Sequence, residues 1–204
     1  MPTANRPRRN TTIVDGSRGQ WKSARIGLDT AFTGTPRLAS VSEDLYSYEP
    51  IGVIRTPFES ATGMPIQPVG DAGSEGTIEI AESYTDGLED LDGFSHCILL
   101  YHFHASSVDG SLKIEPFLDE ERRGVFATRA PQRPNPIGLS VVQIVSVTAP
   151  AVTVSGIDVI DGTPLLDIKP FVPAFDVPAD VETGWLDASR DTVRSTRADD
   201  RFRR

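Results

Sequence analysis

Residues 124–138 constrain the fold more than any other part of the chain. They read GVFATRAPQRPNPIG, with prolines at positions 131, 134 and 136. Proline fixes φ and has no backbone N–H to donate, so this spacing excludes both a helix interior and a central strand. A segment of this kind is stiff before it folds and holds its arginine and asparagine side chains in set directions. We therefore interpret it as a binding loop rather than a connection.

The charge distribution points to the same segment. The net charge is −9, but the first 25 residues carry +5 and the last 15 carry +3, which leaves −17 and only eight Lys/Arg between them. Half of those eight lie within or just before the proline-rich segment: Arg122, Arg123, Arg129 and Arg133. The first two can equally offset the three acids that precede them, whereas Arg129 and Arg133 have no acidic neighbours in the sequence. The pattern predicts a local positive site for an anionic ligand.

Short apolar stretches separated by Gly/Pro turns predict a mainly β fold with an antiparallel sheet or barrel. We expect a short helix or turn over 84–91. Strands are expected over 51–58, 77–81, 94–104, 125–128, 137–147, 152–159 and 165–169. Residues 1–47 read as a disordered extension, 48–189 as the ordered domain, and 190–204 as an Arg/Asp-rich tail that is a frayed helix or simply a tail.

Several classes of protein are disfavoured by what the chain does not contain. The single cysteine, Cys97, rules out an intramolecular disulfide and is typical of a reducing compartment. No apolar run approaches the length of a membrane span, and no apolar segment follows the arginines near the start. A cytoplasmic protein is expected. Dinucleotide, P-loop and nucleophile-elbow motifs are also missing from the sequence.

The three histidines, His96, His102 and His104, are all even-numbered and would share one face of a strand. Same-face histidines can bind zinc or iron, but no second cysteine and no ligand-spaced motif accompanies them. A structural or substrate-contacting role is favoured, and no metal site is predicted. His104 stands out because it lies where the strand is expected to end and loops begin.

A second cluster surrounds a tight turn. Asp158, Asp161 and Asp167 lie in the segment GIDVIDGTPLLDIKP, residues 156–170. Carboxylates and backbone amides in such a turn can bind an amino-acid-like group or ribose hydroxyls. Taken alone, the simpler reading is structural: Asp161 and Gly162 build the turn and Asp158 caps it. Both readings stay open at this point.

Four segments together resemble a known family: 51–58, 93–104, 124–138 and 158–170. In this order they are similar to the TsaA-like family, whose characterised members are TrmO-type tRNA methyltransferases that use S-adenosylmethionine. The resemblance covers roughly residues 49–178 and rests on the strings GVFATRxPxRPNPIG and DGTPLLDIKP. It implies a small antiparallel β-barrel, commonly a homodimer, that binds S-adenosylmethionine without a Rossmann domain. It also implies methylation of the exocyclic amine of threonylcarbamoyl-adenosine at position 37, in the anticodon loop of tRNA.

The resemblance further implies which residues contact the cofactor. Pro134, Asn135 and Gly138 are expected to shape the pocket, and the contacts themselves map to Pro65, Ile66, Gln67, His104, Arg129, Leu139, Asp158, Val159, Ile160, Asp161, Gly162 and Thr163. Arg129 suits a carboxylate, and the aspartate turn suits hydroxyls or an amino group. His104 is a conceivable base for the acceptor, and the catalytic residue stays unassigned.

The acceptor is the open half of the interpretation. RNA binding draws on a basic surface, whereas the body of this chain carries −17. The arginine-rich ends can supply phosphate contacts, especially if they fold on binding. The alternatives are a small-molecule acceptor and a module that binds S-adenosylmethionine without catalysis. A tRNA acceptor is favoured.

Overall fold

The structure, a computed structural model, describes residues 47–70, 73–106, 110–186 and 190–202. Apart from Ser47, the extension expected over 1–47 therefore lies outside the described residues.

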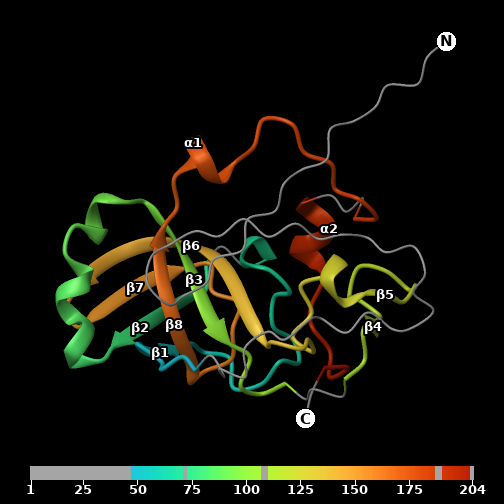
Figure 1. Cartoon of the computed structure of the whole chain (residues 1–204), viewed down its shortest axis with the longest axis horizontal. Helices are drawn as coiled ribbons and strands as arrows, with labels where there is room; N and C mark the ends of the chain where they lie inside the picture. Colours follow the sequence, from blue (N-terminus) through green and yellow to red (C-terminus); the bar gives the residue numbers. More distant parts are fainter. Residues whose placement is uncertain (1–46, 71–72, 107–109, 187–189, 203–204) are drawn as a thin grey trace, which may run out of the picture. The chain divides into compact units, whose positions relative to one another are not determined.

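Six antiparallel strands close into a barrel in the order β1-β2-β7-β6-β3-β8 (Figure 1). The strands are β1 (Gly52–Arg55), β2 (Glu75–Ile80), β3 (His96–His102), β6 (Ile137–Thr148), β7 (Ala151–Ser155) and β8 (Thr163–Pro170). Closure leaves none of these strands with an unpaired edge. The mainly β fold and the small antiparallel barrel predicted for this chain are confirmed.

The remaining elements are short. A separate two-stranded ribbon joins β4 (Lys113–Ile114) to β5 (Arg123–Gly124). The helical pieces are η1 (Pro68–Gly70), η2 (Glu82–Leu88), η3 (Leu91–Gly93), η4 (Val125–Ala127), α1 (Pro173–Asp176) and α2 (Arg190–Ser195). None of the helices in the described ranges is long and apolar enough to cross a membrane.

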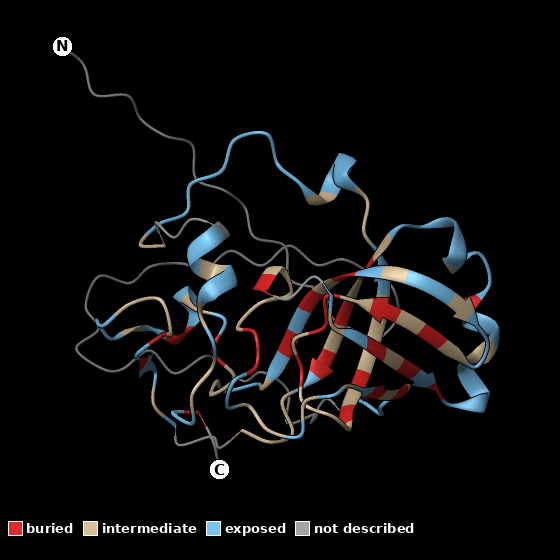
Figure 2. Ribbon diagram, turned by 180° about the vertical axis from the view of Figure 1, so that it is seen from behind, coloured by how far each residue is buried: buried red, intermediate tan, exposed pale blue. Residues whose placement is uncertain are grey.

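The barrel interior follows from the two-residue period of the strands. Along β3, Cys97, Leu99 and Tyr101 are buried, while the residues between them are more exposed (Figure 2). These side chains meet apolar residues from the other strands, from η2 and from the segment after β7 in one core: Ile54, Ile78, Ile80, Leu88, Val142, Val152, Val154, Ile157, Val159 and Leu165.

Two of the expected strands need correction. Residues 125–127 form a 3₁₀ turn, because the backbone N–H and the hydroxyl of Thr128 both donate to the carbonyl of Val125. The strand expected over 152–159 ends at Ser155, because Gly156 has φ +79° and turns the chain inward. Apolar composition alone did not distinguish these turns from strands.

A second, smaller cluster of apolar side chains lies outside the barrel. We call it the satellite cluster: Ile114, Val125, Ala130 and Phe202, with Phe117 packed against them. It brings together the β4–β5 ribbon, the proline-rich segment and the end of the described chain. Residues 190–204 were expected to be a frayed helix or simply a tail; residues 190–195 form the helix α2, and Phe202 packs in the satellite cluster.

Candidate functional site

Strand register brings four distant segments to one end of the barrel. Tyr101, near the end of β3, pairs with Gly138 at the start of β6 and with Leu165 at the start of β8. Ile54, near the end of β1, pairs with Thr163. Because neighbouring strands run antiparallel, the segments that follow β1 and β3 meet those that precede β6 and β8. We call this end the barrel mouth.

A buried hydrogen-bonded chain lies at the mouth. The Ser140 hydroxyl donates to Asp158 Oδ1 at 2.5 Å, and the Tyr101 hydroxyl lies 3.0 Å from Ser140 Oγ. A serine has one hydroxyl proton, so Tyr101 donates to Ser140, which donates to Asp158. Tyr101 and Ser140 are 3% and 1% exposed. The chain fixes the carboxylate of Asp158 against the barrel interior.

The electrostatics of Asp158 follow from this position. Burial raises the pKa of its carboxyl to about 6, while the Ser140 hydrogen bond and the charge of Arg129 act in the opposite direction. Burial likewise raises the pKa of Tyr101 above its usual value. When ionised, the Asp158 carboxylate is a partly buried negative charge, which favours a cationic ligand group.

Gly138 permits the close packing at this point. A Cβ at Gly138 would lie 2.1 Å from Cε2 of Tyr101 and 2.8 Å from Cζ of Phe103. The two rings pack edge to face, with centroids 5.3 Å apart. The glycine thus lets β6 pass directly over the ring whose hydroxyl begins the hydrogen-bonded chain.

The cation of the site comes from the proline-rich segment. Arg129 Nη1 donates to Gln67 Oε1 at 3.1 Å, and Gln67 Nε2 donates to the Ile66 carbonyl at 2.8 Å. The Arg129 guanidinium is exposed and close enough to Asp158 to lower the pKa of that carboxyl. Two segments that the sequence assigned to one pocket therefore meet in the structure.

His104 lies just beyond β3, beside the aspartate turn. Its Nδ1 is 3.3 Å from Thr163 Oγ1, and the Thr163 hydroxyl donates to the Ile160 carbonyl at 2.7 Å. Since that hydroxyl has only one proton, the contact requires His104 to donate from Nδ1. This pairing joins two more of the predicted site residues.

Asp161 has a structural role in the turn. Its Oδ1 accepts from the backbone N–H of Thr56 at 3.0 Å, and its Oδ2 lies 3.7 Å from Arg55 Nη1. Gly162 has φ +76° and donates its N–H to the carbonyl of Ile54. These contacts favour the structural reading for Asp161. Asp158, in contrast, faces the hydrogen-bonded chain of the mouth.

The structure does not bring every predicted residue into this group. Leu139 lies on the outer face of β6 and is 43% exposed. Pro134 and Asn135 are exposed, and the Asn135 carbonyl accepts from Ile137 N at 2.7 Å. Val159 is buried in the core, and its carbonyl accepts from the Thr56 hydroxyl. Their roles in binding stay predictions.

Sequence reasoning missed Tyr101, Ser140 and Thr56. A detectable signal was the parity of the strands: Ser140 shares its face of β6 with buried Val142, so it is a polar residue at an inward position. A buried serine needs a hydrogen-bond partner, which here is Asp158. The partnership of segments so distant in sequence was not visible without the barrel register.

The histidines do not form a metal centre in the described part of the chain, where no group of three or more His, Cys, Asp or Glu is arranged to hold an ion. His96 Nδ1 lies 2.9 Å from Ser95 Oγ, and its ring packs against Phe171. His104 lies past the end of β3, so the strand alternation that would align it with His96 does not reach it.

Comparison with known proteins adds a family. Residues 53–177 match the tRNA-methyltransferase O N-terminal domain. A probable S-adenosyl-L-methionine-binding protein of Pyrococcus abyssi is 48% identical over 155 residues, which are 76% of this chain and 84% of that protein. The tRNA (adenine(37)-N6)-methyltransferase of Rattus norvegicus is 39% identical over 140 residues, 66% of this chain and 32% of that protein.

A solved structure agrees with these matches. The crystal structure of TrmO from Pseudomonas aeruginosa superposes with a TM-score of 0.60 at 40% identity, over 71% of this chain and 64% of that one. The present chain therefore spans less than two thirds of that structure and about a third of the rat protein.

Proposed function

We propose, since the chain belongs to the tRNA-methyltransferase O family through residues 53–177, that it is a methyltransferase acting on tRNA. The acceptor we propose is the exocyclic amine of threonylcarbamoyl-adenosine at position 37. The observation that carries the proposal is the family match over most of the barrel domain. The name of the rat relative, which specifies adenine 37 of tRNA, supports the choice of acceptor.

The cofactor is S-adenosylmethionine, in keeping with the names of the relatives. The groups at the mouth suit it. The Arg129 guanidinium is a charge-assisted partner for its carboxylate, and the desolvated carboxylate of Asp158 favours its ammonium group. When bound, S-adenosylmethionine would supply an electrophilic methyl group on its sulfonium sulfur.

The residues of this chain act mainly by positioning. Methyl transfer forms one N–C bond as the S–C bond breaks, and the acceptor nitrogen gives up its proton to water. The acceptor nitrogen, the methyl and the sulfur must lie in line for this displacement. Gln67 orients Arg129 by a hydrogen bond, and Ser140 fixes Asp158. Both orienting residues are themselves held, Ser140 by the barrel and Gln67 by its contact with the Ile66 carbonyl.

A small-molecule acceptor is the second candidate, and the surface charge favours it. Of the cations in the acidic body, Arg55 pairs with Glu79, Arg123 with Asp119, and Lys169 with Asp167. Each of these pairs reduces the positive charge available to phosphates. A module that binds the cofactor without catalysis is the third candidate.

Nucleoside analysis separates these candidates. Anticodon-loop nucleosides from a strain without the gene are examined by mass spectrometry, and calorimetry measures binding of S-adenosylmethionine to the purified protein. We expect micromolar or tighter binding and loss of the methylated threonylcarbamoyl-adenosine, restored by the wild-type gene. An unchanged nucleoside level with intact cofactor binding would exclude the tRNA reading in favour of the other two.

The homodimer stays part of the proposal. Ile137, Leu139 and Val145 place exposed apolar side chains on β6, and such side chains are more common at interfaces than on isolated surfaces. We also expect a cytoplasmic location, because that is where the proposed tRNA substrate is found.

A further inference from the structure

The last described residues pair with the loop that carries the predicted cofactor contacts Pro65–Gln67. The Gly63 N–H donates to the Ala198 carbonyl at 2.8 Å, and the Ala198 N–H donates to the Met64 carbonyl at 2.9 Å. An antiparallel bridge joins Pro65 to Arg197. Within residues 196–202, which we call the strap, Arg197 and Ala198 therefore lie antiparallel to this loop.

The far end of the strap enters the satellite cluster. Phe202 is 8% exposed and packs with Val125 and Ala130 of the proline-rich segment. Its ring meets Phe117 edge to face, with centroids 5.1 Å apart. Val125 and Ala130 lie on either side of Arg129 in the sequence, so Phe202 supports the backbone that presents this arginine.

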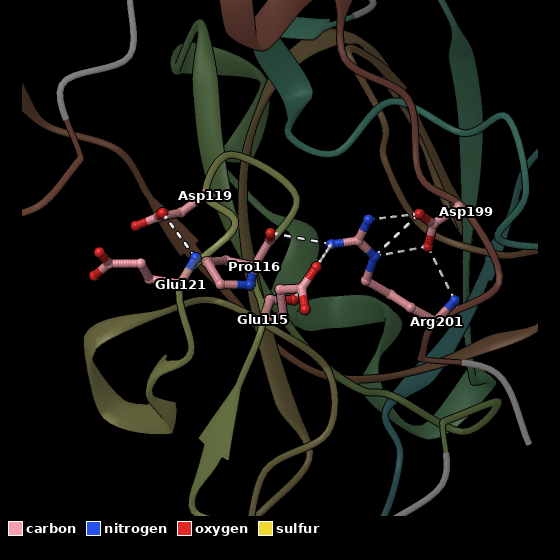
Figure 3. Close-up of polar contacts among 6 residues, drawn as sticks. All are labelled: Glu115, Pro116, Asp119, Glu121, Asp199 and Arg201. Carbon is pink, nitrogen blue, oxygen red and sulfur yellow. Dashed lines mark hydrogen bonds and ion pairs between the residues drawn. The ribbon is translucent and has the colours of Figure 1, made fainter.

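Arg201 locks the strap in place (Figure 3). Its guanidinium binds Asp199 through Nη2 at 2.7 Å, donates to the Pro116 carbonyl at 3.1 Å, and lies 3.7 Å from Glu115 Oε1. The same group lies 5.0 Å from the centre of the Phe117 ring. The hydrogen bond to Asp199 raises the pKa of Arg201 further, so it stays charged.

We propose that the strap is a positioning element of the cofactor site, with Phe202 and Arg201 as positioning residues. One end of the strap holds the loop that contains Gln67, and the other holds the segment that contains Arg129. The Gln67–Arg129 hydrogen bond joins these two supported segments. Without the strap, each partner would have to be ordered when the ligand binds, which weakens binding. The expected effect on the affinity for S-adenosylmethionine rests on the proposed function.

The contacts of the strap argue against its use as a free arm for phosphates. The Arg201 guanidinium is already held by two carboxylates and a carbonyl. Arg197 Nη1 donates to the carbonyls of Arg194 and Thr196. Binding RNA through these side chains would require breaking contacts that the domain already uses.

The test compares Phe202→Ala with Arg194→Ala in the full chain. Arg194 serves as the control because it lies on α2, just before the strap in the sequence. Its side-chain ion pair, 3.7 Å to exposed Asp191, does not touch the two supported segments. Hydrogen exchange read by mass spectrometry follows residues 63–70 and 125–130, with β2 and β7 as internal references. Calorimetry measures the affinity for S-adenosylmethionine.

We expect Phe202→Ala to speed exchange in both segments about tenfold and to weaken cofactor binding about tenfold, with β2 and β7 unchanged. Arg194→Ala should match the wild type, and Phe202→Leu should restore most of the affinity. Unchanged exchange in the two segments, or equal loosening of β2 and β7, would overturn the proposal.

A second variant guards against general unfolding. Arg201→Gln keeps the chain length and a polar side chain but loses the charge that binds Asp199 and Glu115. Faster exchange confined to the two segments supports the strap, and unchanged exchange overturns it. If the wild type fails to bind S-adenosylmethionine, the proposed function fails, while the exchange experiment still decides whether the strap orders the loop.

Discussion

The barrel and the satellite cluster support the same site by different means. The barrel closes a ladder of six strands around one large core, and it carries Asp158 through Ser140. The satellite cluster has a few apolar side chains, a two-stranded ribbon and the strap, and it carries Arg129. The anionic half of the site is thus built on a frame with far more packing than the cationic half.

This difference separates stability from binding. Substitutions in the barrel core remove contacts that the whole domain needs, whereas substitutions in the satellite cluster can be absorbed by local opening. We therefore expect barrel changes to alter global unfolding, and satellite changes to alter ligand affinity and local exchange. The predictions that follow probe this contrast.

The largest effect is expected for Leu99→Ala in the barrel. Leu99 is fully buried on β3, so its truncation loses apolar contacts and leaves a cavity, at a cost of about 4 kcal/mol. The matched change is Val125→Ala in the satellite cluster, which removes a nearly fully buried side chain but should cost only about 1 kcal/mol in global unfolding. Urea unfolding followed by fluorescence measures both. Equal costs would show that the two regions unfold as one unit.

The second effect concerns two carboxylates with opposite pKa shifts. Burial raises the pKa of Asp158 in the barrel from 3.8 to about 6. Between β4 and β5, beside the satellite cluster, the Glu121 N–H and then Arg123 lower the pKa of Asp119. The folded protein binds more protons than the unfolded chain at Asp158, so this group's contribution to stability falls as pH rises from about 4 to 6. Asp119 has the reverse sign: its contribution is present above its unfolded pKa and is lost as pH falls through its folded pKa.

We therefore expect Asp158→Asn to abolish a decrease in stability of roughly 3 kcal/mol between pH 4 and 6. Asp119→Asn should instead flatten the acid side of the curve. Thermal melts over pH 3–8, compared with the wild type, measure both changes. If Asp158→Asn keeps the pH dependence of stability seen in the wild type, the carboxyl of Asp158 does not have the raised pKa that its burial implies.

The contrast between the barrel and the satellite cluster also explains which parts of the structure could be predicted from the sequence. Strand alternation and the family resemblance were enough for the barrel, because its period repeats along each strand. Arg129 stood out because arginines are scarce in an acidic body, and the aspartate turn because Asp-Gly marks a turn; their roles in binding stay predictions. The satellite cluster was missed: residues 190–204 show no apolar period, and a lone Phe202 gives no sign of burial. Its partners lie more than 70 residues away, which only the folded chain reveals.

The smallest change in stability is expected at the two glycines of the proline-rich segment. Gly138 lies in β6 of the barrel, and Gly124 lies in β5 of the two-stranded ribbon. Gly138→Ala would place its Cβ 2.1 Å from the Tyr101 ring, so the ring or β6 must shift, at a cost of about 2 kcal/mol. Gly124→Ala meets no atom within 4 Å, and its φ of −59° suits alanine, so the change should be neutral or stabilise by less than about 1 kcal/mol. Urea unfolding gives both values, and calorimetry should show weaker cofactor binding for Gly138→Ala alone, because the Tyr101 hydroxyl begins the chain that fixes Asp158. If the two variants behave alike, the close contact of β6 with Tyr101 does not constrain the mouth, and the rigid half of the site begins further inside the barrel.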